Sequence, residues 1–285
     1  MRHDEAVLRC LTQTAVLSLA LFAAPGCAPE DDGPARPADC GNTAALPLRA
    51  PGKLTVATDE PAYAPWFHGD DPSNGQGFES ALTYAVAGEM GFAKEQVDWV
   101  RVPFTNAYAP GEKPFDFDVN EVSITPERRQ VVDFSTGYYQ VRQVVLGPSG
   151  VEQATLAQLA QRSIGVVVGT TSSQAIDESV TPRQPVAYFD TNDLAAQALL
   201  AGQVDALVVD LPTGLQIQSA NPAAQLTIFG KLPVVPREEF GLVLGKNSPL
   251  TSCVDEALGS LQQHGSLAGL ERRWLGDSAR IPELA

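Results

Sequence analysis

The stretch NEVSITPERRQVVDFS (Asn120–Ser135) carries the pattern that decides the fold. It follows a short stretch of alternating apolar and acidic residues, FDFDV (Phe115–Val119), which predicts a β-strand, and it turns at Pro126 into the start of a helix. Proline suits the first helical turn because an N–H group has no intrahelical partner there. In an open α/β sheet, ligands lie beyond the carboxyl ends of the strands. The side chains that we expect to face such a crevice are Glu121, Ser123 and Arg128.

Predicted strands and helices alternate along most of the chain. Apolar runs rich in β-branched residues predict strands, whereas apolar residues at helical spacing predict amphipathic helices. This alternation indicates an α/β fold, with two units of roughly 90–100 residues that are joined near 141–148 and again near 237–244. Besides 115–119, strands are predicted at 53–58, 97–102, 164–169, 186–189, 204–210 and 240–246, and helices at 78–91, 155–163, 170–179, 192–203 and, as a long and a short one, within 250–276.

The composition is that of an acidic globular protein. The chain has 285 residues, of which 44% are hydrophobic and 19% charged, with a net charge of −15. It is long enough for one large or two medium cores. Its negative surface repels phosphate backbones and anionic lipid headgroups, so we expect no nucleic-acid partner. High charge also keeps proteins soluble, so the acidity alone identifies no ligand.

The N-terminus has the pattern of an export signal. AVLSLALFAA (Ala15–Ala24) is too short to span a bilayer but fits the apolar core of a secretory signal peptide. The run ends in APGC (Ala24–Cys27), which resembles a bacterial lipoprotein lipobox and implies that Cys27 is acylated after removal of residues 1–26. Ordinary secretion with cleavage nearby is the alternative. Residues 27–50 are rich in Pro, Ala and acid and predict a tether, so we expect an extracytoplasmic protein that contacts the cell membrane only through its lipid.

The cysteine count agrees with export. Of four cysteines, Cys10 leaves with the signal peptide and Cys27 takes the lipid. Cys40 and Cys253 remain, and in an oxidising compartment two cysteines suggest one disulfide. Their spacing is not that of a metal site, and we expect neither a metal nor a cofactor.

A series of motifs in order gives the chain its resemblance to a known family. The motifs are GKLTVATD, YAPW, GFESALTYAVAGEMG, VPF, SITPERRQVVDFSTGYY, VGTTSSQAI, LLAGQVDALVVD, FGLVLGKNSPL and LGSLQQHGSLAGLERRWLG, and they span Gly52–Gly276. The set resembles the amino-acid-binding solute receptors of ABC importers (solute-binding protein family 3, type II periplasmic-binding-protein fold). The resemblance implies two Rossmann-like lobes, joined by two crossover strands, with the ligand in the cleft between them. We expect lobe 1 at 51–143 plus 241–285 and lobe 2 at 144–240.

The resemblance implies how the cleft holds an amino acid. Arg128 matches the family's α-carboxylate ligand, although a surface ion pair is the alternative role for such an arginine. Asp210 matches the residue that takes the α-ammonium, where the alternative is a turn-forming aspartate before Leu-Pro. Tyr63 and Phe104 match the positions that sandwich the ligand side chain, and Asp59 matches one that contacts a polar ligand terminus.

Two hydroxyls lie at a predicted helix start in the second lobe. VVVGTTSSQAI runs from strand through glycine and hydroxyl residues into a helix. The N–H groups at that helix start, together with the hydroxyls of Thr171 and Ser172, form a natural anion site. Side-chain capping of the helix is the alternative role, and both can hold at once.

The ligand class follows from the charges that the motifs place in the cleft. Asp59, Glu121 and Asp210 are three acids beside one clear cation, Arg128. A cationic side chain balances this charge, an amide does so partly, and an acidic ligand adds repulsion. Glu121 stands where the family commonly has a small or neutral residue, which leaves the ligand open. It could instead turn toward Arg129 or Lys113.

We therefore expect a monomeric binding protein that delivers an amino acid to an ABC permease, with no catalytic residues. Two other functions are alternatives: an amino-acid sensor module, and an enzyme of the same fold, dehydratase-like, with Glu121 as a general acid of raised pKa. His3, His68 and His264 lie in no motif, and neither a phosphate loop nor a Ser-His-Asp order is present in the sequence.

Overall fold

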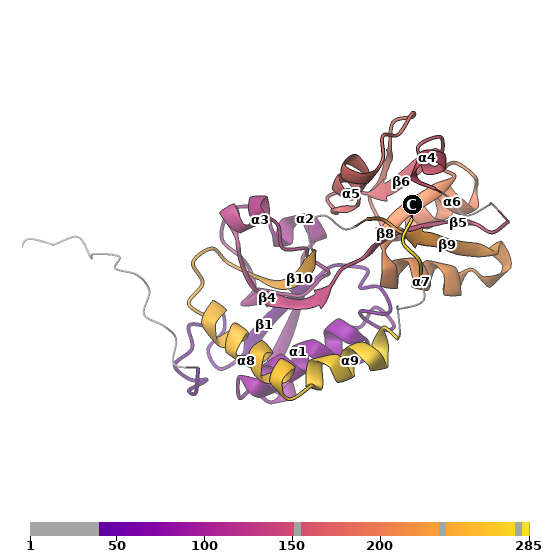
Figure 1. Ribbon diagram of the computed structural model, residues 1–285. Helices are drawn as coiled ribbons and strands as arrows, with labels where there is room; N and C mark the ends of the chain where they lie inside the picture. Colours follow the sequence, from indigo (N-terminus) through magenta and orange to yellow (C-terminus); the bar gives the residue numbers. More distant parts are fainter. Residues whose placement is uncertain (1–39, 151–154, 234–237, 277–280, 285) are drawn as a thin grey trace, which may run out of the picture. The chain divides into compact units, whose positions relative to one another are not determined.

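The computed structural model describes residues 40–150, 155–233, 238–276 and 281–284 (Figure 1). The predicted signal peptide, the predicted lipidation site Cys27 and most of the predicted tether lie outside the described residues. Among the helices that are described, none is long and apolar enough to cross a membrane.

The first sheet is built from both ends of the described chain. Its order is β2-β1-β3-β10-β4. β1 pairs in parallel with β2 and β3, while β10 runs antiparallel to β3 and β4. All five residues of β1 are buried, as expected for a central strand that is covered on both faces. The bounds are β1 Leu54–Thr58, β2 Val97–Arg101, β3 Phe117–Asp118, β4 Asp133–Gln140 and β10 Glu239–Leu244.

The second sheet is built from the middle of the chain. Its order is β7-β6-β8-β5-β9. β6 pairs in parallel with β7 and β8, and β5 runs antiparallel to β8 and β9. The bounds are β5 Gln143–Pro148, β6 Ile164–Val167, β7 Ala187–Phe189, β8 Ala206–Asp210 and β9 Leu226–Lys231.

The chain passes between the two sheets twice. It leaves the first sheet at the end of β4 and enters the second with β5, and it returns between β9 and β10. The predicted α/β fold with two crossovers is therefore confirmed. The sequence pattern does not predict β4, β9 or α7, because their segments (DFSTGYYQ, LTIFGK and LPTGLQIQSA) mix polar or small residues with apolar ones.

Helices flank both sheets. In the first unit, α1, α8 and α9 contact one another and lie side by side in Figure 1. Phe78 and Leu82 of α1 and Leu258 of α8 are buried in the core of this unit. The bounds in this unit are α1 Phe78–Glu89, α2 Phe104–Ala107, α3 Pro126–Val131, α8 Thr251–Gln263 and α9 Ser266–Trp274, with 3-10 turns at Pro72–Asn74 and Lys94–Gln96. The bounds in the second unit are α4 Leu156–Leu159, α5 Ser172–Ser179, α6 Asn192–Leu200 and α7 Leu211–Ala220, with a 3-10 turn at Pro222–Ala224.

The stretch that opens the sequence argument folds as its residues predict. Pro126 is the first residue of α3, and the Thr125 side chain caps the helix by accepting a hydrogen bond from the Arg128 N–H at 3.2 Å. The strand before it is shorter than expected, because only Phe117 and Asp118 pair as β3. The remaining residues up to Thr125 form the loop that reaches the cleft.

The C-terminal residues Ile281–Leu284 lie on the second sheet. The Lys231 N–H donates to the Pro282 carbonyl and the Leu284 N–H donates to the Lys231 carbonyl, each at 2.8 Å. Leu284 is buried over Gly230, where an added Cβ would lie 2.8 Å from its Cδ2. This placement differs from the expected assignment of 241–285 to the first lobe. It could not be predicted from the sequence, because a contact made by one leucine and two backbone hydrogen bonds leaves no periodic pattern.

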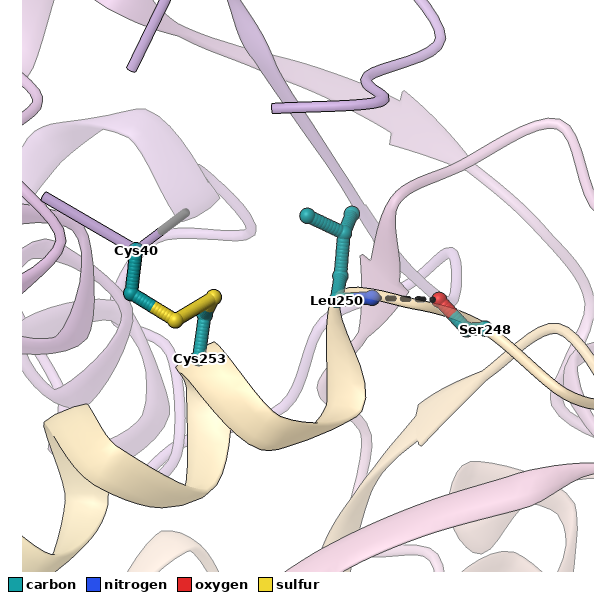
Figure 2. Close-up of a disulfide and its surroundings, with 4 residues drawn as sticks. All are labelled: Cys40, Ser248, Leu250 and Cys253. Atoms are coloured by element: carbon teal, nitrogen blue, oxygen red, sulfur yellow. Dashed lines mark hydrogen bonds between the residues drawn. A yellow bond between two sulfur atoms is a disulfide. The ribbon is translucent and has the colours of Figure 1, made fainter. Parts of the chain in front are cut away.

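A disulfide joins Cys40 to Cys253, the pair that the cysteine count suggests (Figure 2). The two Cα atoms are 5.3 Å apart, within the ordinary range for a disulfide. Cys253 lies in the first turn of α8, just after Leu250, whose N–H donates to Ser248 Oγ at 3.3 Å. The bond ties the start of the described chain to the helices that cover the first sheet.

Replacing both cysteines, as Cys40→Ser with Cys253→Ser, should lower the free energy of unfolding. The bond closes a sequence separation of 213 residues. The chain-entropy model gives about 5 kcal/mol for such a loop, as an upper figure. Urea unfolding of the double variant measures the loss. Two reactive thiols in the exported wild-type protein, or an unchanged unfolding midpoint in the variant, would contradict the expectation.

Candidate functional site

A cavity of about 330 Å³ lies where the loops after several strands converge. It includes residues that follow β1 and β3 of the first sheet and β6 and β8 of the second. This is the position that open α/β sheets give to ligands. Eight of the nine predicted ligand-binding residues line it: Asp59, Tyr63, Phe104, Glu121, Ser123, Thr171, Ser172 and Asp210.

The ninth residue, Arg128, lies beside the cavity and does not line it. Its side chain is buried, and its guanidinium carbon lies 4.2 Å from the centroid of the Tyr108 ring. Nη1 donates to the Ser123 carbonyl at 2.7 Å, and Nη2 donates to the Gly169 carbonyl at 2.8 Å. Ser123 follows β3 and Gly169 follows β6, so this arginine links loops that belong to different sheets. The surface ion pair considered for it from the sequence is therefore wrong.

Glu238, which the sequence analysis missed, does not line this cavity but binds two hydroxyls that do. Ser123 Oγ donates to Glu238 Oε1 at 2.6 Å, and Thr171 Oγ1 donates to the same oxygen. The other oxygen, Oε2, lies 3.5 Å from Gln143 Nε2. The only signal in the sequence is an acidic pair directly before the strand FGLVLGK, in the region of the second crossover.

Gln143, at the start of β5, is a second missed residue, and it connects Asp210 and Ser172, which both line the cavity. Its Nε2 donates to Asp210 Oδ1 at 2.6 Å, and its Oε1 accepts a hydrogen bond from Ser172 Oγ at 2.9 Å. Thr171 is the N-cap residue of α5, but its side chain makes no capping bond. The hydroxyl of Thr171 instead donates to Glu238 and that of Ser172 donates to Gln143, so the anion-binding role stays a prediction.

Glu121 faces the cavity through an uncommon backbone conformation. Its φ of +54° lies in the left-handed region, which non-glycine residues rarely adopt. Its N–H donates to Glu79 Oε1 at 2.8 Å, and Thr213 Oγ1 donates to its Oε2 at 3.3 Å. Neither alternative partner is engaged with it: Arg129 lies over the Phe134 ring, and Lys113 Nζ donates to the Asn106 carbonyl at 3.2 Å and to the Ala109 carbonyl.

Two further carboxyl groups lie buried behind Glu121. Burial raises the pKa of Glu79 to about 7, against the hydrogen bonds from Tyr138 and the Glu121 N–H, which lower it. Burial, and then the charge of Glu79, raise the pKa of Asp118 well above its usual range. Among the described residues, both carboxylate oxygens of Asp118 and Oε2 of Glu79 have no hydrogen-bond partner.

The acids that line the cavity also have raised pKa values. Burial, and then the charges of Glu79 and Asp210, raise the pKa of Glu121 well above its usual range. Burial, and then the charge of Glu238, do the same for the pKa of Asp210, and burial also raises the pKa of Asp59. The described lining residues include Asp59, Glu60, Glu121, Asp190 and Asp210, and they include no Lys, Arg or His.

Aromatic side chains shape one wall of the cavity. Tyr63 and Phe104 line it, and the Phe104 ring packs edge-on against Tyr108 with centroids 5.4 Å apart. Tyr108 in turn donates its hydroxyl to the Gly169 carbonyl at 3.0 Å. Trp66, which the sequence left between cleft and core, is fully buried in the core of the first unit.

The raised pKa of Glu79 predicts that the protein becomes less stable as the pH rises from about 4.5 to about 7. In this range the folded protein holds a proton that the unfolded chain has released, so stability falls with increasing pH. The loss from this one group is on the order of 3 kcal/mol. Urea unfolding at pH 5 and pH 8 measures it. The Glu79→Gln variant, which keeps an acceptor for Glu121 and Tyr138, should show a smaller difference, and an equal difference would contradict the assignment.

Comparisons with known proteins agree with this geometry. The family model for bacterial extracellular solute-binding proteins, family 3, matches residues 54–277. A probable histidine-binding protein of Neisseria gonorrhoeae is 28% identical over 229 residues, which cover 79% of this chain and 84% of that protein.

Two solved structures extend the comparison. The arginine-, lysine-, histidine-binding protein ArtJ of Geobacillus stearothermophilus is 27% identical, with a TM-score of 0.67 over 80% of this chain and 97% of that one. An ancestral amino acid-binding protein, a precursor of cyclohexadienyl dehydratase, is 29% identical, with a TM-score of 0.65 over 79% and 95%. The resemblance seen in the sequence is confirmed, and the chain belongs to the bacterial extracellular solute-binding proteins of family 3.

Proposed function

We propose that the protein captures a polar or cationic amino acid in the cavity and delivers it to an ABC permease. The observation that carries the proposal is the charge of the cavity, whose described lining has five acids and no basic side chain. A positively charged ligand relieves the repulsion among these acids. The family supports the role, because the relatives described above are binding proteins for amino acids.

The ligand's backbone groups are proposed to bind at the polar end of the cavity. Its α-carboxylate binds near Ser123, Thr171 and Ser172, beside the guanidinium of Arg128, and its α-ammonium binds Asp210. These groups offer hydroxyl donors, a helix N-terminus and a carboxylate within one small region.

The ligand's side chain is proposed to extend between Tyr63 and Phe104 toward Asp59 and Glu121. An alkyl chain suits the aromatic wall, and a terminal cation suits the two acids at its end. Both acids line the cavity.

Export and anchoring complete the proposal. We infer that residues 1–26 form a lipoprotein signal peptide and that lipid on Cys27 holds a monomeric protein at the extracytoplasmic face of the membrane. The lipobox-like APGC and the tether-like composition that follows it support this inference.

A catalytic role is the second candidate. Glu121 lines the cavity with a raised pKa, which suits a general acid, and one similar structure is a precursor of a dehydratase. The described histidines, His68 and His264, do not line the cavity. Turnover of prephenate-like acids by the purified protein would place the catalytic role ahead of the binding role.

Arg128→Ala should weaken amino-acid binding by several kcal/mol. It removes a buried cation beside the ligand's carboxylate and leaves that carboxylate without its counter-charge. Titration calorimetry on the folded variant measures the effect. Arg129→Ala is the matched control, because Arg129 is adjacent in sequence but lies over Phe134. Near-normal affinity of Arg128→Ala would refute this role.

The cavity charge predicts an order of ligand affinities. Lysine, arginine or ornithine should bind most tightly, glutamine less tightly and glutamate least, because only a cationic or donor group balances Asp59 and Glu121. Competition calorimetry with these amino acids measures the order. Tightest binding of glutamate would show the charge argument to be wrong.

A tight ligand should also raise the free energy of unfolding by roughly 3–4 kcal/mol at 100 to 1,000 times its dissociation constant.

A further inference from the structure

Glu238 does not line the ligand cavity, but it accepts hydrogen bonds from two hydroxyls that do and that the proposed function assigns to the ligand's α-carboxylate. We define the carboxylate subsite as Ser123 Oγ and Thr171 Oγ1, the two hydroxyls that converge on Glu238 Oε1. One hydroxyl follows β3 of the first sheet and the other precedes α5 beside the second sheet. Hydrogen bonds from hydroxyls to an ionised carboxylate are charge-assisted and stronger than bonds between neutral groups. The subsite therefore already holds a carboxylate, and it is the protein's own.

The surroundings of the subsite also favour a negative charge. The Thr171 hydroxyl makes no bond to its own helix, so it is available to an anion. The N-terminus of α5, an eight-residue helix, carries the positive end of the helix dipole. The charge of Arg128 lies within electrostatic reach of Glu238, and its Nη1 donates to the carbonyl of Ser123 itself.

We propose that Glu238 is a built-in occupant of the carboxylate subsite, which an arriving amino acid must displace. This inference rests on the proposed function. Two carboxylates cannot share these donors, because like charges at hydrogen-bond distance in a partly buried site repel strongly. Glu238 thereby helps to determine specificity: a ligand with an additional positive group offsets part of the repulsion during displacement, whereas an acidic ligand adds to it.

The size of the effect follows from how often the subsite is open. An apparent dissociation constant equals the intrinsic one divided by the fraction of molecules that are competent to bind. A subsite that Glu238 fills about nine-tenths of the time therefore weakens binding about tenfold. Removing the charge of Glu238 should recover that factor.

The first experiment compares Glu238→Gln with the wild type by titration calorimetry, using the amino acid that binds the wild type most tightly. The neutral variant should bind about tenfold more tightly. Glu239→Gln is the matched control, since that side chain lies against Gly137 of β4, and it should leave the affinity unchanged. Unchanged binding by Glu238→Gln would overturn the proposal. Weaker binding would also overturn it, and would assign Glu238 to the ligand's ammonium.

The second experiment tests the subsite without an amino acid. Glu238→Ala leaves the two hydroxyls without their carboxylate, so acetate should bind there and raise the melting temperature relative to chloride at equal ionic strength. The wild type and Glu239→Ala should show no such difference. Absence of an acetate effect in Glu238→Ala would overturn the proposal.

The two experiments separate this inference from the proposed function. If no amino acid binds any form of the protein, the proposed function fails, while the acetate result still decides the place of Glu238. If amino acids bind and the acetate effect is absent, the function stands and the inference fails. If Glu238→Ala does not fold, the affinity of the isosteric Glu238→Gln variant, compared with that of the wild type, tests the inference by itself.

Discussion

Acidic side chains at the carboxyl ends of the strands give the cavity its negative charge. Glu79 and Asp118 are fully buried, and Glu121 and Asp210 are half-buried in front of them. None of the ion pairs found among the described residues includes any of these four. Buried charge without a counter-ion is costly, and a raised pKa is the usual consequence. A cation that enters the cavity lowers this cost. The relief of repulsion among the buried acids then contributes to the free energy with which a cation binds.

Side-chain hydrogen bonds link loops of the two sheets beside the cavity. Arg128 spans the carbonyls of Ser123 and Gly169, and Glu238 spans the hydroxyls of Ser123 and Thr171. A ligand therefore exchanges existing hydrogen bonds for new ones. The net gain of such an exchange is much smaller than the strength of the new bonds alone. Selectivity then depends on which ligand groups replace these contacts without leaving a buried donor or acceptor unpaired.

The sequence predicts the parts of the site that belong to local patterns. Strand ends, the proline-initiated helix at Pro126 and the hydroxyls at the start of α5 all follow from runs of a few residues. Of the eight predicted residues that line the cavity, Asp59, Tyr63 and Phe104 came instead from the family resemblance. Gln143 and Glu238 were missed for a physical reason. Each lies where the chain crosses between sheets, so its neighbours come from distant segments and no periodicity marks it. Leu284 was misplaced for the same reason, because the residue that it packs against, Gly230, comes from a distant segment of the chain.

The orientation of Glu121 shows how the core determines the chemistry of the cavity. A left-handed backbone at a non-glycine residue carries a conformational cost, and it persists only where the surroundings enforce it. Here the Glu121 N–H donates to Glu79 Oε1, and Tyr138 donates to the same oxygen from β4. The buried carboxyl of Glu79 therefore fixes the backbone that presents Glu121 to the cavity. After burial, the charge of Glu79 also raises the pKa of Glu121. One core side chain thus influences both the direction and the protonation of an acid that lines the cavity.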